Sequence, residues 1–356
     1  MDLSNADCIL VMGSNMAENH PVGFRFVMQA KEKGAEVIHV DPRFTRTSAS
    51  ATRFVAMRSG SDLVFLGALV NHVLQNQQDF REYVVHYTNA AAILPDGFVD
   101  AEDNGGIFSG LVDAEGGGGV RYDPGLGKWG YGQGDPAGPG FHLETDPTLR
   151  HPRCVYQVLQ RHFARYTPEL VERICGTPRA EFEAVAEALE ANSGRERTSV
   201  ICYAVGWTQQ STGPQIIRAA SILQLLLGNI GRPGGGILAL RGHASIQGST
   251  DIPTLYDLLP GYIPQPLAGH QHRDLDAFLA SGTMPRGLWA NFPAYFISLM
   301  KAWYGAAATP QNDYAYEHLP KRTGDHSQQA QFRAMLDGRL KGYLVLGQNP
   351  AAGNTN

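Results

Sequence analysis

The chain has 356 residues, of which 43% are hydrophobic and 18% charged, and 34 acidic against 29 basic residues give a formal net charge of −5. This length can bury substantial cores and predicts about two domains. The composition is typical of a globular protein, and the absence of a basic block argues against nucleic acid as a partner. No apolar run approaches the roughly 18 residues of a membrane-spanning helix.

The cysteines are widely spaced and never form a Cys-x-x-Cys pair, which argues against zinc or iron–sulfur ligation within this chain. We expect no metal ligand here and predict four small buried apolar side chains, at Cys8, Cys154, Cys175 and Cys202. The first residues contain neither the basic nor the apolar segment of an export signal, so they do not assign a compartment.

The N-terminal part has the pattern of a β-α-β unit. A buried strand is predicted over 6–13, a helix over 21–34 and a second strand over 36–40, with a short third strand over 54–57. A helix is predicted over 63–74 from its apolar spacing. The sequence therefore predicts an α/β, doubly wound fold with mostly parallel sheets, helices on both faces and a dinucleotide-binding topology.

The composition changes to glycine, proline and acidic residues at about 90–150, which predicts an irregular, glycine-rich surface insertion. Regular elements then resume, with helices and one strand that returns to the sheet. The helices are predicted over 155–166, 168–174, 179–192 and 216–227, and the strand over 199–205.

The last third of the chain is predicted to be irregular over 251–285 and helical over 296–303, with a final strand over 342–346. We expect two domains. The first, residues 1–243, is an α/β dinucleotide-binding domain, and residues 244–356 form a partial second α/β cofactor-binding domain. A strand and turn with no following helix predict that this second domain is truncated.

Residues 227–248 contain seven glycines and the motif Arg241-Gly242-His243. Glycines permit positive φ and a close approach to a ligand, and a guanidinium offers a planar fork to a carboxylate or phosphate. The segment therefore predicts a pocket for an anion. The alternative is a helix C-cap followed by a tight loop, with Gly228 and Gly231 only ending the preceding helix.

In doubly wound sheets, ligands bind beyond the carboxyl ends of the strands. The turn after the first predicted strand can bind phosphate through backbone N–H groups, and its polar side chains can bind sugar or base edges. The candidate cofactor residues of this turn are Gly13, Ser14, Asn15, Glu18, Asn19 and His20, although a lone histidine is more often structural. The turn is not Gly-x-Gly-x-x-Gly, which favours a dinucleotide other than a nicotinamide one.

The ends of the next two strands carry similar chemistry. Asp41, with Pro42 and Arg43, can accept ribose or guanine hydrogen bonds, while Arg43 and Arg46 offset phosphate charge. The alternative is a helix N-cap beside surface arginines. After the third predicted strand, Asp62 can accept hydrogen bonds from the donor edge of guanine. The alternative is that Asp62 caps the next helix together with Ser61. The candidates at this second strand end are Arg58, Gly60 and Asp62.

Two further turns complete the candidate set. Thr208 and Gln209 suit hydrogen bonds to a polar heterocycle such as a pterin, whereas Trp207 is an obvious core residue. The residues of this first turn are Gly206, Trp207, Thr208, Gln209 and Gly213. Those of the second, which could serve another cofactor from the second domain, are Gly347, Gln348 and Asn349.

These motifs, taken in order, resemble those of molybdopterin oxidoreductases of the formate dehydrogenase type. The resembling segments are 11–21, 41–47, 58–62, 206–209, 227–248 and 346–350. Residues 151–154 and 174–178 look most like the major (alpha) subunits of respiratory formate dehydrogenases. The resemblance covers nearly all of this chain but only the middle of a full subunit of that family.

The resemblance implies two molybdopterin guanine dinucleotides around one molybdenum or tungsten atom, and two-electron oxidation of formate to carbon dioxide or the reverse. Arg241 matches the arginine that orients formate, with Gly242 and His243 beside it. Electrons would pass to an iron–sulfur subunit. The family's 4Fe-4S cysteines and its selenocysteine or cysteine metal ligand would lie upstream of Met1, and its C-terminal domain is also absent, so we expect an internal fragment that is inactive alone.

Two rival functions remain from the sequence, and a nicotinamide-dependent dehydrogenase is a more distant third. One is another molybdopterin oxidoreductase, acting on nitrate or an arsenic oxyanion. The other is a non-catalytic protein that binds or assembles the cofactor.

Overall fold

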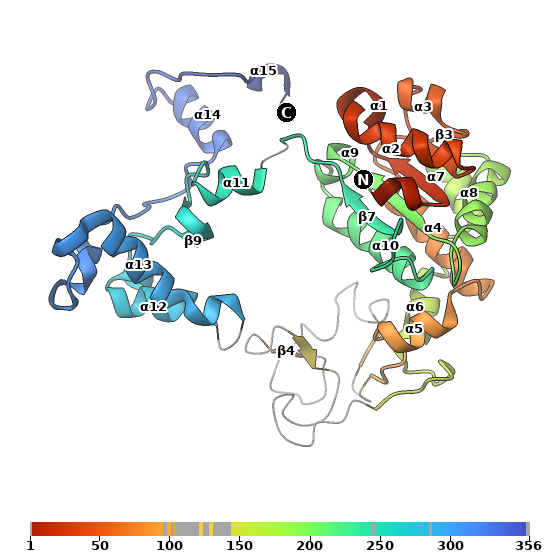
Figure 1. The fold of residues 1–356 in the computed structure, drawn as a ribbon, viewed down its shortest axis with the longest axis horizontal. Coiled ribbons are helices and arrows are strands. Elements are labelled where there is room, and N and C mark those ends of the chain that lie inside the picture. The colour runs from red at the N-terminus through yellow and green to blue at the C-terminus, as the bar shows by residue number, and fades with distance from the viewer. Residues whose placement is uncertain are drawn as a thin grey trace. The chain divides into compact units, whose positions relative to one another are not determined.

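A five-stranded parallel sheet organises the first part of the chain, with the strand order β3-β2-β1-β6-β7 (Figure 1). This computed structural model describes residues 2–94, 98–100, 103, 121–123, 128–130, 144–243, 246–284 and 287–353. All four strand pairs of the sheet are parallel. The strands are β1 (Cys8–Met12), β2 (Glu36–Asp41), β3 (Arg53–Ala56), β6 (Ser199–Tyr203) and β7 (Gly236–Ala239).

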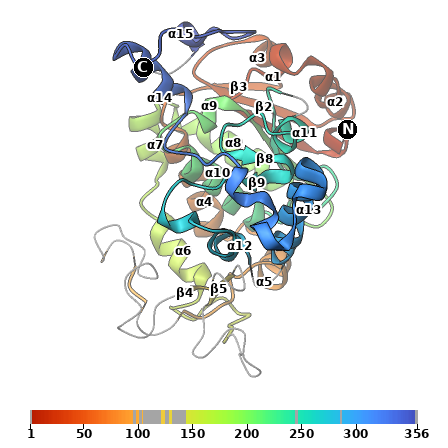
Figure 2. The ribbon, with the colours of Figure 1, turned by 90° about the vertical axis from the view of Figure 1, so that its left-hand side faces the viewer.

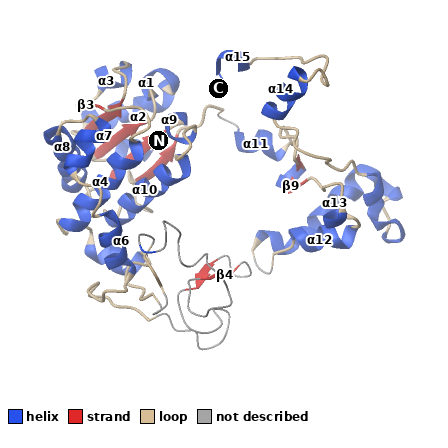
Figure 3. Cartoon of the chain, turned by 180° about the vertical axis from the view of Figure 1, so that it is seen from behind, coloured by secondary structure: helices blue, strands red, loops and turns tan. Residues whose placement is uncertain are grey.

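Helices cover both faces of this sheet (Figure 3). Alternate residues of β1 point to opposite faces, so Ile9 and Val11 join the core beneath α2, while Leu10 and Met12 join the core beneath α4 and α10. The helices of this unit are α1 (Met16–Asn19), α2 (Pro21–Glu32), α3 (Arg46–Ser50), α4 (Asp62–Gln75), α5 (Arg81–Tyr87), α6 (Val155–Phe163), α7 (Pro168–Cys175), α8 (Arg179–Ala191), α9 (Val205–Thr208) and α10 (Gly213–Leu226), preceded by the 3-10 helix η1 (Asp2–Asn5). The predicted α/β fold class is confirmed.

Local sequence signals explain where several helices begin and end. Pro21 occupies the first turn of α2, where its missing N–H costs nothing, and Gly34 follows the helix with φ +102°. Thr167 caps α7 by accepting a hydrogen bond from the Leu170 amide at 3.2 Å, and Gly176 ends that helix at φ +69°. These predicted boundaries agree with the structure to within a few residues.

A second compact unit begins at His243, whereas the first extends to Gly242. Its described core contains the rings of Phe278, Phe292, Phe296 and Tyr316, which pack on one another. The three phenylalanines come from α12 (Leu275–Gly282) and α13 (Phe292–Tyr304), which Figure 2 labels. Its elements are α11 (Ile246–Asp251), β8 (Leu258–Leu259), η4 (Pro260–Tyr262), β9 (Ile263–Pro264), η5 (His270–His272), α12 (Leu275–Gly282), η6 (Leu288–Asn291), α13 (Phe292–Tyr304), η7 (Gly305–Ala307), η8 (Pro310–His318), α14 (Gln328–Leu336) and α15 (Pro350–Gly353).

Two predictions for the C-terminal third are wrong, and a third is confirmed with a different start. Residues 251–285 are not uniformly irregular, because they contain α12 and the antiparallel pair β8–β9. The helix predicted over 296–303 is confirmed, although it begins four residues earlier, at Phe292, with a proline in its first turn. Residues 342–346 form no strand, since a strand needs a hydrogen-bonded neighbour and no described strand pairs with this apolar segment.

Most of the predicted insertion at 90–150 lies outside the described residues. Its described strands, β4 (Arg121–Asp123) and β5 (Lys128–Gly130), form an antiparallel pair.

The four cysteines are buried and unbridged, which confirms their prediction as buried side chains. Burial raises the pKa of the Cys202 thiol to about 12 and raises that of Cys8 as well, so both thiols stay protonated and unreactive at neutral pH. No helix in the described part of the chain combines the length and apolar character needed to cross a membrane.

An ion pair between α4 and α8 makes the stability of this unit depend on pH. His72 Nδ1 lies 2.8 Å from Glu190 Oε1, and this hydrogen bond raises the pKa of His72. A raised folded pKa stabilises the fold fully below the unfolded histidine pKa, and the stabilisation is lost as pH rises through the folded value. We expect His72→Gln to cost about 1 kcal/mol near pH 6 and less near pH 9. Urea unfolding of both proteins at the two pH values measures this difference, and a cost independent of pH would contradict it.

Candidate functional site

Two predicted glycine turns meet where the sheet changes direction. The chain runs from β1 outward through β2 and β3, then returns beside β1 at β6, so the carboxyl ends of β1 and β6 form the topological switch point. There the Gly206 amide donates to the Gly13 carbonyl at 3.1 Å. A Cβ on Gly206 would lie 2.6 Å from that carbonyl oxygen, so the two turns pack too closely for a larger residue.

Trp207 and Asp62 stabilise the turn after β6 at this switch point. The indole is fully buried, stacks on Tyr203 with ring centroids 5.0 Å apart, and donates from Nε1 to Asp62 Oδ1 at 3.1 Å. Gln210 Nε2 donates to the other carboxylate oxygen at 2.8 Å. Burial raises the pKa of Asp62. Both oxygens of this predicted guanine ligand are thus engaged within the protein, and Asp62 holds the turn after β6 in place.

The turn after β1 is stiffened by its own polar side chains. Asn15 Oδ1 accepts from Thr47 Oγ1 at 2.9 Å, and the Asn15 amide group contacts the Glu18 carboxylate. Asn19 Nδ2 donates to the Asn15 carbonyl at 3.1 Å. Arg46 forms an exposed ion pair with Glu18 at 3.3 Å. The structure therefore brings together the residues that the sequence predicted for this turn, with α3 as their support.

Asp41 lies at the carboxyl end of β2 in a local turn of its own. Its Oδ1 accepts from the Arg43 amide at 2.9 Å, whereas the N-cap of α3 is Thr45. The alternative in which Asp41 caps a helix is therefore wrong. Pro42 is exposed, as is the Arg43 side chain. An open hollow of about 500 Å³ lies here, lined by Glu18, Arg43, Phe44, Thr45, Arg46 and Ala49.

Sequence reasoning missed His39, which connects these two strand ends. The fully buried imidazole lies 3.2 Å from the Ser14 carbonyl through Nε2 and 2.8 Å from Ser48 Oγ through Nδ1. Because a carbonyl only accepts, Nε2 carries the proton. Burial lowers the pKa of His39, opposed by Asp41 at 3.7 Å. A histidine inside an otherwise apolar strand, two residues before a candidate ligand, was the available signal.

Other predicted site residues lie apart from this edge or serve the fold. Arg58 Nη1 donates to the carbonyls of Arg173 and Ile174 at the end of α7, at 2.7 and 3.2 Å. Gly60 lies in an exposed turn at φ +83°, and a Cβ on Gly213 would lie 2.9 Å from the Trp207 carbonyl. The residues of the second unit, Gly347, Gln348 and Asn349, are exposed. Thr208 and Gln209 are exposed beside the switch point.

The glycine-rich segment contains the strand β7, which the sequence did not predict. Gly228 follows α10 at φ +73°, and Cβ atoms on Gly234 and Gly235 would overlap the backbone of Asn5 and Asn229. Most of these glycines therefore serve the turn between α10 and β7, as the helix-cap alternative proposed. Arg241 and Gly242 follow β7 at the carboxyl edge of the sheet and are exposed, as is His243 at the start of the second unit.

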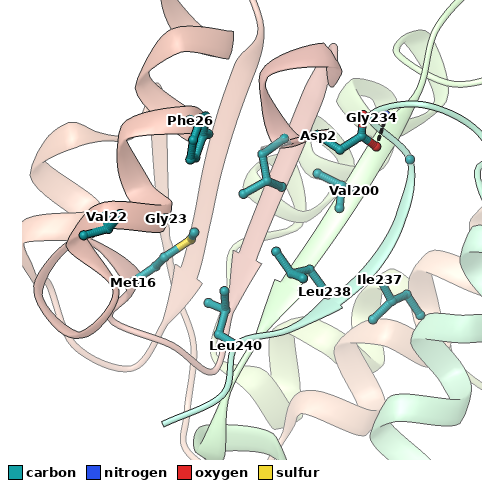
Figure 4. A pocket seen from close by; sticks show the side chains of 12 residues that line it. Asp2, Met16, Val22, Gly23, Phe26, Val200, Gly234, Ile237, Leu238 and Leu240 are labelled. Carbon is teal, nitrogen blue, oxygen red and sulfur yellow. Dashed lines mark hydrogen bonds between the residues drawn. The ribbon is translucent and has the colours of Figure 1, made fainter. Parts of the chain in front are cut away.

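A well-defined pocket of about 310 Å³ lies on the face of the sheet beside α2 rather than at this edge (Figure 4). Met16, Val22, Leu238 and Leu240 line it with apolar side chains. Its charged residue, Asp2, accepts a hydrogen bond from the Gly234 amide at 2.8 Å. Such a lining does not suit a phosphate or a polar heterocycle.

The carboxyl edge of β1, β2 and β6, in contrast, suits an extended polar ligand. It combines a tight glycine turn, the exposed Arg43 guanidinium, the half-buried Asp41 carboxylate and the exposed polar side chains of α9. Within the described ranges, one buried polar atom near it, His20 Nδ1, has no hydrogen-bond partner. The residues present therefore fit a dinucleotide with phosphates and heterocyclic ends. No cluster of three or more metal-ligating side chains occurs among the described residues.

This fold defines a doubly wound α/β protein, a class in which ligands bind at the topological switch point. The model of the molybdopterin oxidoreductase family matches residues 1–355, and the chain belongs to that family. It is 44% identical over 99% of its length to the nitrate-inducible formate dehydrogenase major subunit of Escherichia coli. It is 41% identical over 98% of its length to the formate dehydrogenase 2 subunit alpha (cytochrome c-553) of Nitratidesulfovibrio vulgaris.

The chain spans about a third of the length of these relatives, 34% in both cases. Among solved structures, acetylene hydratase from Pelobacter acetylenicus aligns with 64% of this chain and 22% of its own, at 17% identity and a TM-score of 0.40. This chain is similar in sequence to one region of formate dehydrogenase major or alpha subunits.

Proposed function

We propose that this chain is the central part of the catalytic subunit of a formate dehydrogenase, which oxidises formate to carbon dioxide or catalyses the reverse reaction. The observation that carries the proposal is the 44% identity over 99% of the chain, combined with a polar switch-point edge that suits a dinucleotide. The family resemblance supports two molybdopterin guanine dinucleotides and one molybdenum or tungsten atom as cofactors. When bound, they supply the two-electron redox chemistry.

The residues of this chain would bind and orient the cofactor and the substrate. Gly13 and the turn that follows it present backbone N–H groups to phosphate, and Asp41 accepts from the guanine or ribose. Arg43 offsets phosphate charge, and the exposed Thr208 and Gln209 side chains suit the pterin. Arg241 binds the formate carboxylate, with His243 as its neighbour. Electrons would leave toward an iron–sulfur subunit through a cluster outside this chain.

The purified 356-residue chain is expected not to oxidise formate. The thiolate or selenolate metal ligand and the electron-relay cluster belong, by the resemblance, to sequence that this chain does not contain. A partly built cofactor cleft also binds weakly, because its ordering cost is not offset. Formate-dependent dye reduction by the purified chain, supplied with cofactor, measures this. Turnover above the level of a heat-denatured control would contradict it, and tight retention of guanine dinucleotide without turnover would favour a carrier function instead.

Asp41→Ala and Asp62→Ala, made in a full-length catalytic subunit, should each lower guanine dinucleotide content more than they weaken formate binding in the molecules that remain loaded. The first removes a ligand, and the second releases Trp207 and the turn after β6. Each leaves donors unpaired, at about 1–3 kcal/mol per buried group. Mass spectrometry of the bound pterin measures the content, with Asp62→Asn as a variant that keeps an acceptor for the indole. Unchanged content would show that neither residue supports the cofactor.

A further inference from the structure

One hydrogen bond ties the turn after the first strand to the segment that follows the last strand of the sheet. His20 Nε2 lies 3.0 Å from the carbonyl oxygen of Arg241, a residue 221 positions away in the chain. His20 stands between α1 and α2, and Arg241 lies two residues beyond β7. The contact therefore joins the proposed cofactor turn to the residue proposed to bind formate, and both residues belong to the first compact unit.

The chemistry of the imidazole fixes the direction of this bond. A backbone carbonyl only accepts, so Nε2 must carry the proton and donate. The other ring nitrogen, Nδ1, is buried and has no hydrogen-bond partner in the part of the chain that the structure describes. The bond to Arg241 is thus the one polar contact that the described structure gives this side chain. A histidine that only filled space at this position would have no need of a polar group at Nε2.

Little else restrains the backbone beyond β7. The Leu240 amide donates to the Tyr203 carbonyl at 2.8 Å, and the Leu240 side chain lies in the apolar pocket with Met16 (Figure 4). Past Leu240, the Arg241 side chain is exposed, and Gly242 has open space on the side where a Cβ would lie. Among the residues that the structure describes, His20 therefore provides the last hydrogen bond from the first unit to this segment before His243.

We propose that His20 is a positioning residue for Arg241: its imidazole holds the Arg241 backbone so that the guanidinium presents its planar fork to the substrate carboxylate. This inference rests on the proposed function, in which Arg241 binds formate. If the Arg241 backbone is free to move, its guanidinium loses the alignment on which bidentate binding of a carboxylate depends. His20 then contributes to substrate affinity without touching substrate, and it differs from the phosphate-binding or base-binding role that its place in the glycine turn would suggest.

The matched variants are His20→Ala, which removes the donor, and His20→Gln, whose carboxamide N–H can donate to the same carbonyl. His86→Gln on α5, an exposed position far along the chain from either turn, controls for the loss of a histidine. In a full-length catalytic subunit, His20→Ala should raise the KM for formate about three- to tenfold, the size expected for one lost hydrogen bond, at unchanged cofactor content. His20→Gln should restore KM to within about twofold.

Hydrogen exchange on the 356-residue chain provides a second readout that does not depend on activity. The peptide over residues 238–243 should exchange faster in His20→Ala and return to wild-type protection in His20→Gln and His86→Gln. Equal KM values for His20→Ala and wild type, or a loss of activity that follows guanine dinucleotide content, would overturn the inference. If the wild-type subunit does not oxidise formate, the proposed function fails, and unchanged exchange at 238–243 in His20→Ala would separately show that His20 does not hold Arg241.

Discussion

Arg241→Lys in a full-length catalytic subunit should lower formate turnover by about a hundredfold while metal and pterin content stay near normal. Lysine keeps the positive charge but replaces a rigid planar fork with a point charge on a flexible stem. The exposed position of Arg241 beyond β7 allows this change without disturbing the core. Steady-state kinetics normalised to bound metal measure the effect.

His243→Ala is the matched neighbour in the same motif and should have a milder effect, since an imidazole beside the carboxylate adds less than a bidentate partner. A different pattern would contradict the assignment. If Arg241→Lys lost the cofactor but kept proportionate activity per metal, the arginine would be a ligand of phosphate or pterin rather than of substrate.

Gly13→Ala should destabilise the first unit by about 2–4 kcal/mol, from strain and overpacking together. Gly13 has φ +69°, and an added Cβ would lie 2.6 Å from Cδ1 of the buried Trp207 ring. Because the indole is also held by Asp62, it cannot move aside without breaking that hydrogen bond. The measurement is the free energy of unfolding in urea, combined with near-ultraviolet circular dichroism of the tryptophan environment.

Gly60→Ala provides the control for backbone strain alone. Its φ is +83°, but no atom lies within 4 Å of the Cβ that alanine would add. We expect it to cost about 1 kcal/mol, so the difference between the two variants isolates the contact with Trp207. Equal costs would mean that the indole has room to shift and that the two glycine turns are not tightly packed.

The sheet could be predicted where strands are continuous apolar runs between turn signals. The predicted strands agree with β1, β2, β3 and β6 to within two residues at each end. A short continuous apolar run between turn signals is typical of a parallel strand that is buried on both faces. β7 was missed, since three consecutive glycines at 234–236 obscure a strand that begins at Gly236. The strand predicted over 342–346 is wrong for the opposite reason: this segment has the composition of a strand, but no described strand pairs with it.

The arrangement of the candidate site could be predicted in outline because parallel strands end at the same edge, which brings Gly13, Asp41 and Gly206 together. What could not be predicted are the links between side chains far apart in sequence. The indole of Trp207 bonds to Asp62 across 145 positions, and His20 reaches Arg241 across 221. Such contacts depend on helix placement and rotamers, which no local pattern encodes. The sequence likewise did not reveal that the Asp62 carboxylate accepts hydrogen bonds from Trp207 and Gln210.

The most direct test of this account is the cofactor content and substrate range of a full-length catalytic subunit that contains this region. The purified protein would be analysed by mass spectrometry for pterin dinucleotide, and the same preparation assayed for dye reduction with formate and for nitrate reduction. The account predicts guanine dinucleotide and formate-dependent activity that Arg241→Lys strongly lowers. A preparation loaded with guanine dinucleotide that reduces nitrate but does not oxidise formate, or an active enzyme without guanine dinucleotide, would contradict it.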